Sequence, residues 1–134
     1  MTSEEKSTPA PLIFVVDDEP MLLELAKAIL APRGFRVQTF RDPESTLEVY
    51  RTLTVFPDLI LTDYAMHAMT GMDLIRDSRK LNPNQKIILV SGTVDENIYR
   101  HATEKPDRFM GKPYETEKLL EAIRELLAGQ ARFP

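Results

Sequence analysis

Five side chains that could carry chemistry each follow a short apolar run in this 134-residue chain: Asp17, Asp18, Asp63, Ser91 and Lys112. The runs have the length and composition of buried β-strands. In a parallel α/β sheet, the carboxyl ends of the strands lie at one edge, and ligands bind there. Three carboxylates, a hydroxyl and an ammonium group suit a divalent metal ion and a phosphoryl group. The sequence therefore predicts a metal- and phosphoryl-binding site at this edge.

The composition fits one domain and excludes several kinds of site. The net charge is −4 and the basic residues are scattered, which argues against nucleic-acid binding. The absence of cysteine excludes disulfides, thiolate metal sites and a cysteine nucleophile, and fits a reducing compartment. No apolar run approaches the ~20 residues of a membrane span, and residues 1–10 lack the apolar core of a signal peptide. We expect a soluble, cytoplasmic protein that binds neither nucleic acid nor a membrane.

Five strand–helix units alternate along the chain, which indicates an α/β fold with a parallel sheet. Strands are expected at residues 12–16, 35–39, 58–63, 86–90 and 109–110. Helices are expected at residues 20–30, 43–53, 71–81, 95–103 and 115–128. We expect residues 1–11 to be a flexible N-terminal tail, residues 12–128 to form the domain, and residues 129–134 to be a short C-terminal tail with no output domain.

Helical spacing of apolar residues predicts which faces of the helices are buried. The first helix has a candidate stripe of Leu22, Leu25, Ala26, Ile29 and Leu30. The third helix has Leu74, Ile75 and Leu81, and the last has Leu119, Leu120, Ile123, Leu126 and Leu127. The helix expected at 95–103 carries few core residues, so we expect it to be weakly anchored.

The order of the motifs resembles the receiver domain of two-component response regulators. The motifs are Asp17-Asp18, Asp63-Tyr64-Ala65-Met66 with Gly71, Ser91-Gly92, and Lys112-Pro113. Each motif alone is common, but the four occur in order, each at a strand end, over about residues 12–128. The resemblance implies a flavodoxin-like, doubly wound (βα)5 fold with a five-stranded parallel sheet in the order 2-1-3-4-5.

The resemblance also implies how the acidic residues act. Asp63 would be the nucleophile that accepts a phosphoryl group from a sensor histidine kinase or a histidine phosphotransfer protein. Asp17, Asp18 and Asp63, together with the backbone carbonyl of Ala65, would hold Mg²⁺ as the cofactor. Among these ligands, Asp17 would act largely through water. Such a domain catalyses only its own phosphorylation and dephosphorylation, so it is a signalling protein rather than an enzyme.

Further residues complete the implied site and the switch. Lys112, before a cis peptide bond to Pro113, would pair with one phosphoryl oxygen, and Ser91 would donate a hydrogen bond to another. Ser91 and Phe109 would form the switch that reports phosphorylation. The downstream protein would bind the surface made by the helix at 95–103, the strand at 109–110 and the helix at 115–128.

Alternatives stay open at this point. A pseudo-receiver that never carries phosphate would be a pure interaction module. A phosphatase-type hydrolase would need a second acid two residues after Asp63, where Ala65 stands. The chain could be a stand-alone regulator, a phosphorelay shuttle or part of a hybrid kinase. Two departures from the family pattern are His67, where proline is usual, and Pro106-Asp107-Arg108 before the last strand. With no partner at metal-ligand spacing, His67 and His101 are expected to be exposed.

Overall fold

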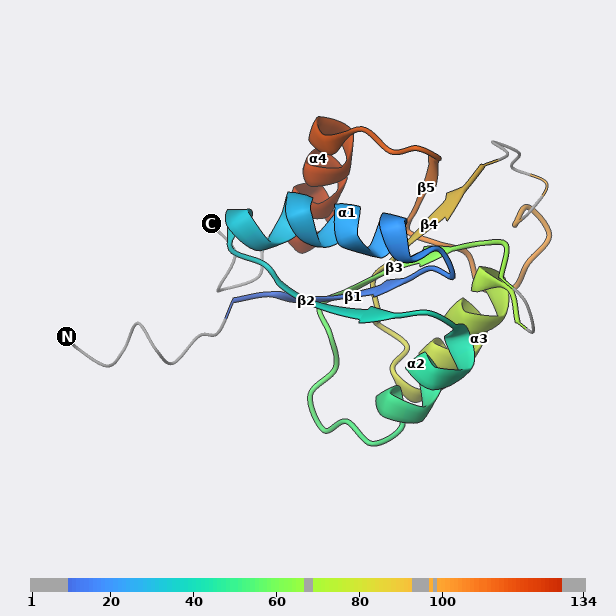
Figure 1. Cartoon of the computed structure of the whole chain (residues 1–134). Coiled ribbons are helices and arrows are strands. Elements are labelled where there is room, and N and C mark those ends of the chain that lie inside the picture. Colours follow the sequence, from blue (N-terminus) through green and yellow to red (C-terminus); the bar gives the residue numbers. More distant parts are fainter. Residues whose placement is uncertain (1–9, 67–68, 93–96, 98, 129–134) are drawn as a thin grey trace.

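A five-stranded parallel sheet forms the centre of the protein (Figure 1). The computed structural model describes residues 10–66, 69–92, 97 and 99–128. The strands are β1 (Leu12–Val16), β2 (Arg36–Phe40), β3 (Leu59–Asp63), β4 (Ile87–Ser91) and β5 (Arg108–Gly111). Their order in the sheet is β2-β1-β3-β4-β5, and all neighbours are parallel. The expected fold class and strand order are confirmed.

Helices cover both faces of the sheet (Figure 1). The helices are α1 (Pro20–Leu30), α2 (Pro43–Tyr50), α3 (Gly71–Leu81) and α4 (Thr116–Leu127), and a short 3₁₀ helix η2 (Ala31–Arg33) follows α1. Helices α1 and α4 lie on one face, and α2 and α3 lie on the other. Alternate residues of β1 therefore enter two separate cores, Ile13 and Val15 in one and Phe14 and Val16 in the other. Burial on both faces explains why the three central strands β1, β3 and β4 consist almost entirely of apolar residues.

Local side-chain chemistry determines where the helices begin. Pro20 occupies the first turn of α1, where its missing N–H costs nothing. The Asp42 carboxylate accepts the N–H of Ser45 at 2.6 Å and caps α2. Thr70 and Asp73 form a capping box at the start of α3. These caps satisfy backbone donors at the helix starts.

The buried faces of two helices differ from the expectation. In α1 the buried residues are Leu23, Ala26, Ile29 and Leu30, whereas Leu22 is half-buried and Leu25 is 39% exposed. The predicted stripe is confirmed at Ala26, Ile29 and Leu30 and wrong at Leu22 and Leu25. Neighbouring leucines offer two overlapping helical stripes, and packing selects the one that contains Leu23. Leu81 at the end of α3 is 45% exposed, also contrary to the prediction.

The helix expected at residues 95–103 falls partly outside the described residues. Within the part that is described, residues 99–101 form a turn, and the Ala102 N–H donates to the Tyr99 carbonyl at 3.1 Å. Asn97 has 3₁₀ geometry, and the described residues between β4 and β5 contain no α-helix. A stretch with so few apolar residues gains little from packing as a helix. The helix labelled α4 (Thr116–Leu127) corresponds to the one expected at residues 115–128.

Gly71 lets α3 begin in close contact with the end of β3. Its N–H donates to the Tyr64 carbonyl at 2.9 Å. A Cβ atom at this position would overlap the Asp63 carbonyl oxygen and lie 2.7 Å from Leu89 Cδ1. A backbone oxygen cannot move aside as the end of a flexible side chain can. The absence of a side chain at Gly71 therefore keeps the loop after Asp63 in place.

We expect Gly71→Ala to destabilise the protein by about 1–3 kcal/mol, because the added methyl group overpacks the contact between α3 and β3. Urea unfolding measures the change. Gly92→Ala is the matched control, since a Cβ there meets no atom within 4 Å. Equal stability of the two variants would contradict the close-contact explanation.

Candidate functional site

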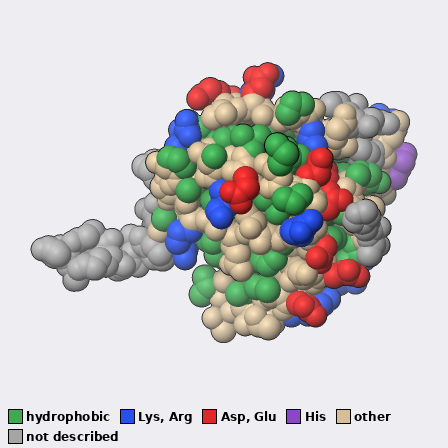
Figure 2. Space-filling model, in the orientation of Figure 1, with side chains coloured by type: hydrophobic (Ala, Val, Ile, Leu, Met, Phe, Trp, Pro, Cys, Tyr) green, Lys and Arg blue, Asp and Glu red, His purple; other side chains and the backbone are tan. Residues whose placement is uncertain are grey.

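The five residues selected from the sequence lie at one edge of the sheet. Asp17 and Asp18 follow β1, Asp63 ends β3, Ser91 ends β4 and Lys112 follows β5. The strands β1, β3, β4 and β5 are successive neighbours and all run in the same direction. Their carboxyl ends point to the right-hand side of Figure 1. In the same orientation, Figure 2 shows acidic side chains gathered on this side, over the turn between β1 and α1.

Three carboxylates meet in the cluster of Asp17, Asp18 and Asp63, referred to as the acidic cluster. One oxygen from each lies within 4.8 Å of the others. Asp17 and Asp63 are each only 5% exposed, and Asp18 is half-buried. The Asp17 N–H donates to the Phe40 carbonyl of β2 at 3.1 Å, which places the turn against the sheet. Oxygen donors this close are a suitable set for a hard divalent cation.

Lys112 lies against the acidic cluster. Its Nζ is 3.2 Å from Asp17 Oδ2, 3.2 Å from Asp63 Oδ2 and 3.3 Å from Glu19 Oε1. The Lys112 N–H donates to the Ser91 carbonyl at 2.8 Å, which ties its backbone to the end of β4. The Lys112–Pro113 peptide bond is cis, as the resemblance implied. One ammonium group thus partly neutralises several carboxylates.

The pKa values of these groups reflect the competition between burial and pairing. Burial raises the pKa of Asp63, and the charge of Asp17 raises it further, while Lys112 lowers it in part. Burial also raises the pKa of Asp17, against the opposing effect of its hydrogen bonds to Glu19 and Lys112. Burial by itself would lower the pKa of Lys112, but its contacts with Asp17 and Asp63 raise the pKa above its ordinary value. The ionised cluster is therefore electrostatically unfavourable despite Lys112.

The remaining predicted residues lie beside the cluster or behind it. Ser91 is buried, with 5% exposure, at the end of β4. Phe109 in β5 is half-buried, and its ring centre lies 5.3 Å from that of Tyr99. Ala65 is exposed in the loop after β3. His101 is exposed as expected, and His67 lies outside the described residues.

Sequence reasoning missed the contact of Glu19 with Lys112. The structure shows that the Glu19 N–H donates to Asp17 Oδ1 at 2.9 Å, while the side chain reaches Lys112. Its place directly after Asp17-Asp18 was the available signal. This contact is exposed to solvent and contributes little to stability.

Residues 13–124 match the response regulator receiver domain family. The chain belongs to this family. The chemotaxis protein CheY of Thermotoga maritima is 27% identical over 116 residues, which cover 85% of this chain and 95% of that protein. The probable transcriptional regulatory protein TcrX of Mycobacterium tuberculosis is 29% identical over 117 residues, or 86% of this chain. The chain spans 49% of TcrX and 13% of the sensor kinase CckA of Brucella abortus, which is 28% identical over 119 residues.

Solved receiver domains have the same fold. The CheY-like receiver domain protein from Methanospirillum hungatei superposes with a TM-score of 0.81 at 28% identity, covering 88% of this chain and 94% of that one. The response regulator TrrA of Thermotoga maritima, solved in complex with Mg²⁺ and BeF, gives 0.76 at 28% identity, with coverages of 87% and 99%. Receiver domains bind Mg²⁺ at an acidic pocket, and this chain has an aspartate cluster at the corresponding edge. None of its described helices has the length and apolar character to cross a membrane.

We expect Asp63→Asn to raise the melting temperature at about pH 7. A carboxyl group whose folded-state pKa exceeds its ordinary value of 3.8 is harder to ionise in the folded protein. Its contribution to stability therefore falls as the pH rises through the folded-state pKa. Asparagine carries no charge, so the variant avoids the free-energy cost of the ionised carboxylate in the folded protein. Its gain in melting temperature should shrink as the pH falls towards 4, because Asp63 of the wild type then becomes protonated. In a domain of this size, about 1 kcal/mol corresponds to about 4 °C.

Asp77→Asn is a control with the opposite sign. The Arg76 hydrogen bond and charge lower the pKa of Asp77, so its ionised form stabilises the folded protein above the unfolded-state pKa. This variant should lose a small amount of stability at neutral pH and recover it as the pH falls. A lower melting temperature for Asp63→Asn at neutral pH would contradict the electrostatic account.

Proposed function

We propose that this receiver domain accepts a phosphoryl group on Asp63 and then changes its affinity for a downstream protein. The phosphoryl donor is a sensor histidine kinase or a histidine phosphotransfer protein. The observation that supports the proposal most directly is the position of Lys112, which contacts both Asp63 and Asp17 beside Asp18. Family membership supports a role in two-component signalling.

Asp63 has the position of a nucleophile. It ends β3, and its buried carboxylate lies beside those of Asp17 and Asp18 and contacts Lys112. In the proposed reaction, an Asp63 oxygen forms a bond to phosphorus as the bond between phosphorus and the donor histidine breaks. The histidine nitrogen keeps the electron pair of that bond. The product is an aspartyl phosphate, a covalent intermediate of the kind that carboxylates form.

The donor set fits Mg²⁺. Asp17, Asp18 and Asp63 supply carboxylate oxygens, and the carbonyl of Ala65 would supply another, with water completing the shell. When bound, the cation would reduce the repulsion between the Asp63 carboxylate and the incoming phosphoryl group. The raised pKa of Asp63 is consistent with a site that lacks sufficient positive charge by itself.

Lys112 and Ser91 would recognise the phosphoryl group. The Lys112 ammonium already lies 3.2 Å from Asp63 Oδ2, so a modest movement brings it to a phosphoryl oxygen. Ser91 ends the strand beside β3 and has a hydroxyl that can donate to a second oxygen. Phe109 is paired in register with Leu89, two residues before Ser91. A movement of Ser91 towards the phosphoryl group would leave room for the Phe109 ring and alter the surface around Tyr99, β5 and α4.

Intact mass measured after incubation with acetyl phosphate and Mg²⁺ tests the proposal. We expect one base-labile phosphoryl adduct on the wild-type protein, because Asp63 has the position of the nucleophile. Asp63→Asn should carry no adduct. Asp77→Asn removes a carboxylate on α3 instead, and it should be phosphorylated like the wild type.

Two outcomes would contradict phosphorylation at Asp63. An adduct that persists in Asp63→Asn would assign it to another side chain. A wild-type protein that takes up no phosphate, while remaining folded, would favour a pseudo-receiver that acts only through protein contacts.

A further inference from the structure

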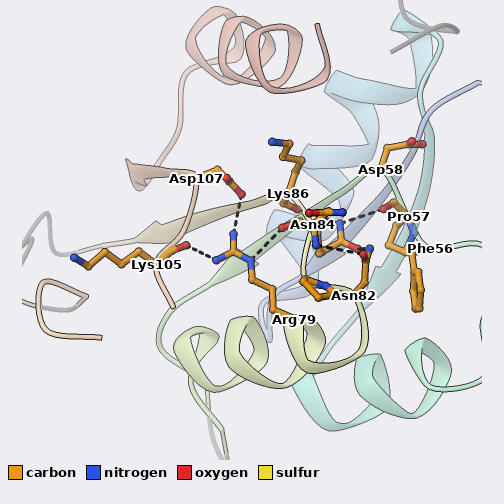
Figure 3. A pocket seen from close by; sticks show the side chains of 11 residues that line it. Phe56, Pro57, Asp58, Arg79, Asn82, Asn84, Lys86, Lys105 and Asp107 are labelled. Carbon is orange, nitrogen blue, oxygen red and sulfur yellow. Dashed lines mark hydrogen bonds and ion pairs between the residues drawn. The ribbon is translucent and has the colours of Figure 1, made fainter. Parts of the chain in front are cut away.

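A polar cavity lies at the end of the sheet opposite the acidic cluster. Its volume is about 640 Å³, and its lining includes residues that precede β3, β4 and β5, such as Asp58, Lys86 and Asp107. Figure 3 shows the guanidinium of Arg79 at this cavity, directed from α3 towards Lys105 and Asp107. The side chain of Arg79 is 10% exposed. A buried guanidinium needs partners, and their positions show what Arg79 holds together.

Arg79 joins α3 to the connection between β4 and β5. Its Nη2 donates to Asp107 Oδ2 at 2.9 Å, and its Nη1 donates to Glu104 Oε1 at 3.3 Å and to the Lys105 carbonyl. Its Nε donates to the Gln85 carbonyl at 3.2 Å. All three nitrogens of one planar group are therefore used, and most of their partners lie in residues 104–107.

Gln85, whose carbonyl accepts the Arg79 Nε–H, is itself held by buried hydrogen bonds. Gln85 is 2% exposed, and its side chain accepts from the Tyr50 hydroxyl at 2.7 Å and donates to the Pro57 carbonyl at 3.1 Å. These bonds link the loop before β4 to α2 and to the loop before β3. Arg79 thus attaches residues 104–107 to a part of the protein with fixed packing.

Asp107 adds a second attachment. Its Oδ2 accepts the Ile87 N–H at 2.7 Å, and its own N–H donates to the Ile87 carbonyl at 2.9 Å. The same carboxylate oxygen therefore bonds both to Arg79 and to the first residue of β4. Residues 104–107 are held at the amino end of β4, whereas Ser91 and Lys112 lie at the carboxyl ends of β4 and β5.

We propose that Arg79 anchors residues 104–107, so that the rearrangement caused by phosphorylation stops at Glu104. Tyr99 and its neighbours up to Thr103 would respond to the site and absorb the backbone change, while residues 104–107 keep their place as the fixed segment beside this hinge. The proposal has two parts: the anchoring of residues 104–107 by Arg79, and the limit that this anchor sets on the rearrangement. Only the second part rests on the proposed phosphorylation of Asp63. The anchoring itself is a property of the unphosphorylated protein. A hinge of this kind needs a few residues that absorb the backbone change next to a fixed segment.

Arg79→Lys tests the anchor while keeping the positive charge. A lysine ammonium cannot reproduce the planar set of donors that reaches two carbonyls and two carboxylates. In hydrogen–deuterium exchange without any phosphoryl donor, the amide of Asp107 should exchange about tenfold faster or more than in the wild type, because losing charge-assisted hydrogen bonds favours local opening. Amides of β1 and β3 should be unchanged.

Arg76→Lys is the control, since Arg76 lies about one turn earlier on α3 and its ion pairs among the described residues are with Asp73 and Asp77 of the same helix. It should leave the Asp107 amide unaffected. Should Arg79→Lys fail to fold, Asp107→Asn keeps an oxygen for the Ile87 N–H but removes the charge that faces Arg79, and it should also speed exchange. Exchange at Asp107 that is unchanged in every variant that folds would overturn the anchor.

The limit on the rearrangement is tested by the amide shifts that follow addition of Mg²⁺ and beryllofluoride, which is a stable mimic of the phosphoryl group. In the wild type, shifts should reach Tyr99 and Phe109 but remain small over residues 104–107. In Arg79→Lys they should extend into residues 104–107. Large shifts there in the wild type would overturn the hinge. No shifts at any position would count against the proposed function, while the exchange result would still decide the anchor.

Discussion

The rest of the structure must compensate for three carboxylates, two of them buried, that the sheet holds within 4.8 Å of one another. Burial disfavours the charged form of a carboxyl group, and like charges this close also repel one another. Burial makes this repulsion stronger, because water cannot screen charges in a pocket where Asp17 and Asp63 are each 5% exposed. Lys112 offsets part of it through contacts of 3.2 Å to both residues. Burial nevertheless keeps the pKa of both aspartates above the ordinary value, and for Asp63 the charge of Asp17 adds to this effect. A protein can keep such a cluster only if the rest of the fold supplies the stability that it lacks.

The two-sided core supplies that stability and also the geometry. Strands buried on both faces hold the backbone of β1, β3 and β4 rigidly, so the side chains at their ends have little freedom to move apart. Gly71 brings α3 against the Asp63 carbonyl without a side chain between them. At the other end of the sheet, Arg79 and Asp107 hold the last part of the β4–β5 connection. The site and the anchor thus lie at opposite ends of the same strands.

Much of this could be predicted from sequence, for identifiable reasons. The central strands β1, β3 and β4 could be predicted because a strand covered on both faces is almost continuously apolar. The site residues could be predicted because parallel strands end at one edge. The buried face of α1 was predicted only in its second half, since Leu22, Leu23 and Leu25 fit more than one helical stripe. The contacts of Glu19 and Arg79 depend on distances between segments far apart in the chain. For Glu19 the only signal in the sequence was its place directly after Asp17-Asp18, and for Arg79 there was none. In the sequence, Pro106-Asp107-Arg108 stood out only as a departure from the family pattern, which did not indicate a contact with Arg79.

The most direct test of the account is the melting temperature of the wild-type protein as a function of Mg²⁺ concentration. A cation that binds the folded acidic cluster and not the unfolded chain stabilises by mass action, by about 2.7 kcal/mol at a hundred times its dissociation constant. We predict a rise over millimolar Mg²⁺ that is much smaller in Asp18→Asn and fully retained in Asp77→Asn. A melting temperature that does not respond to Mg²⁺, or that responds equally in all three proteins, would contradict a metal site at this edge of the sheet.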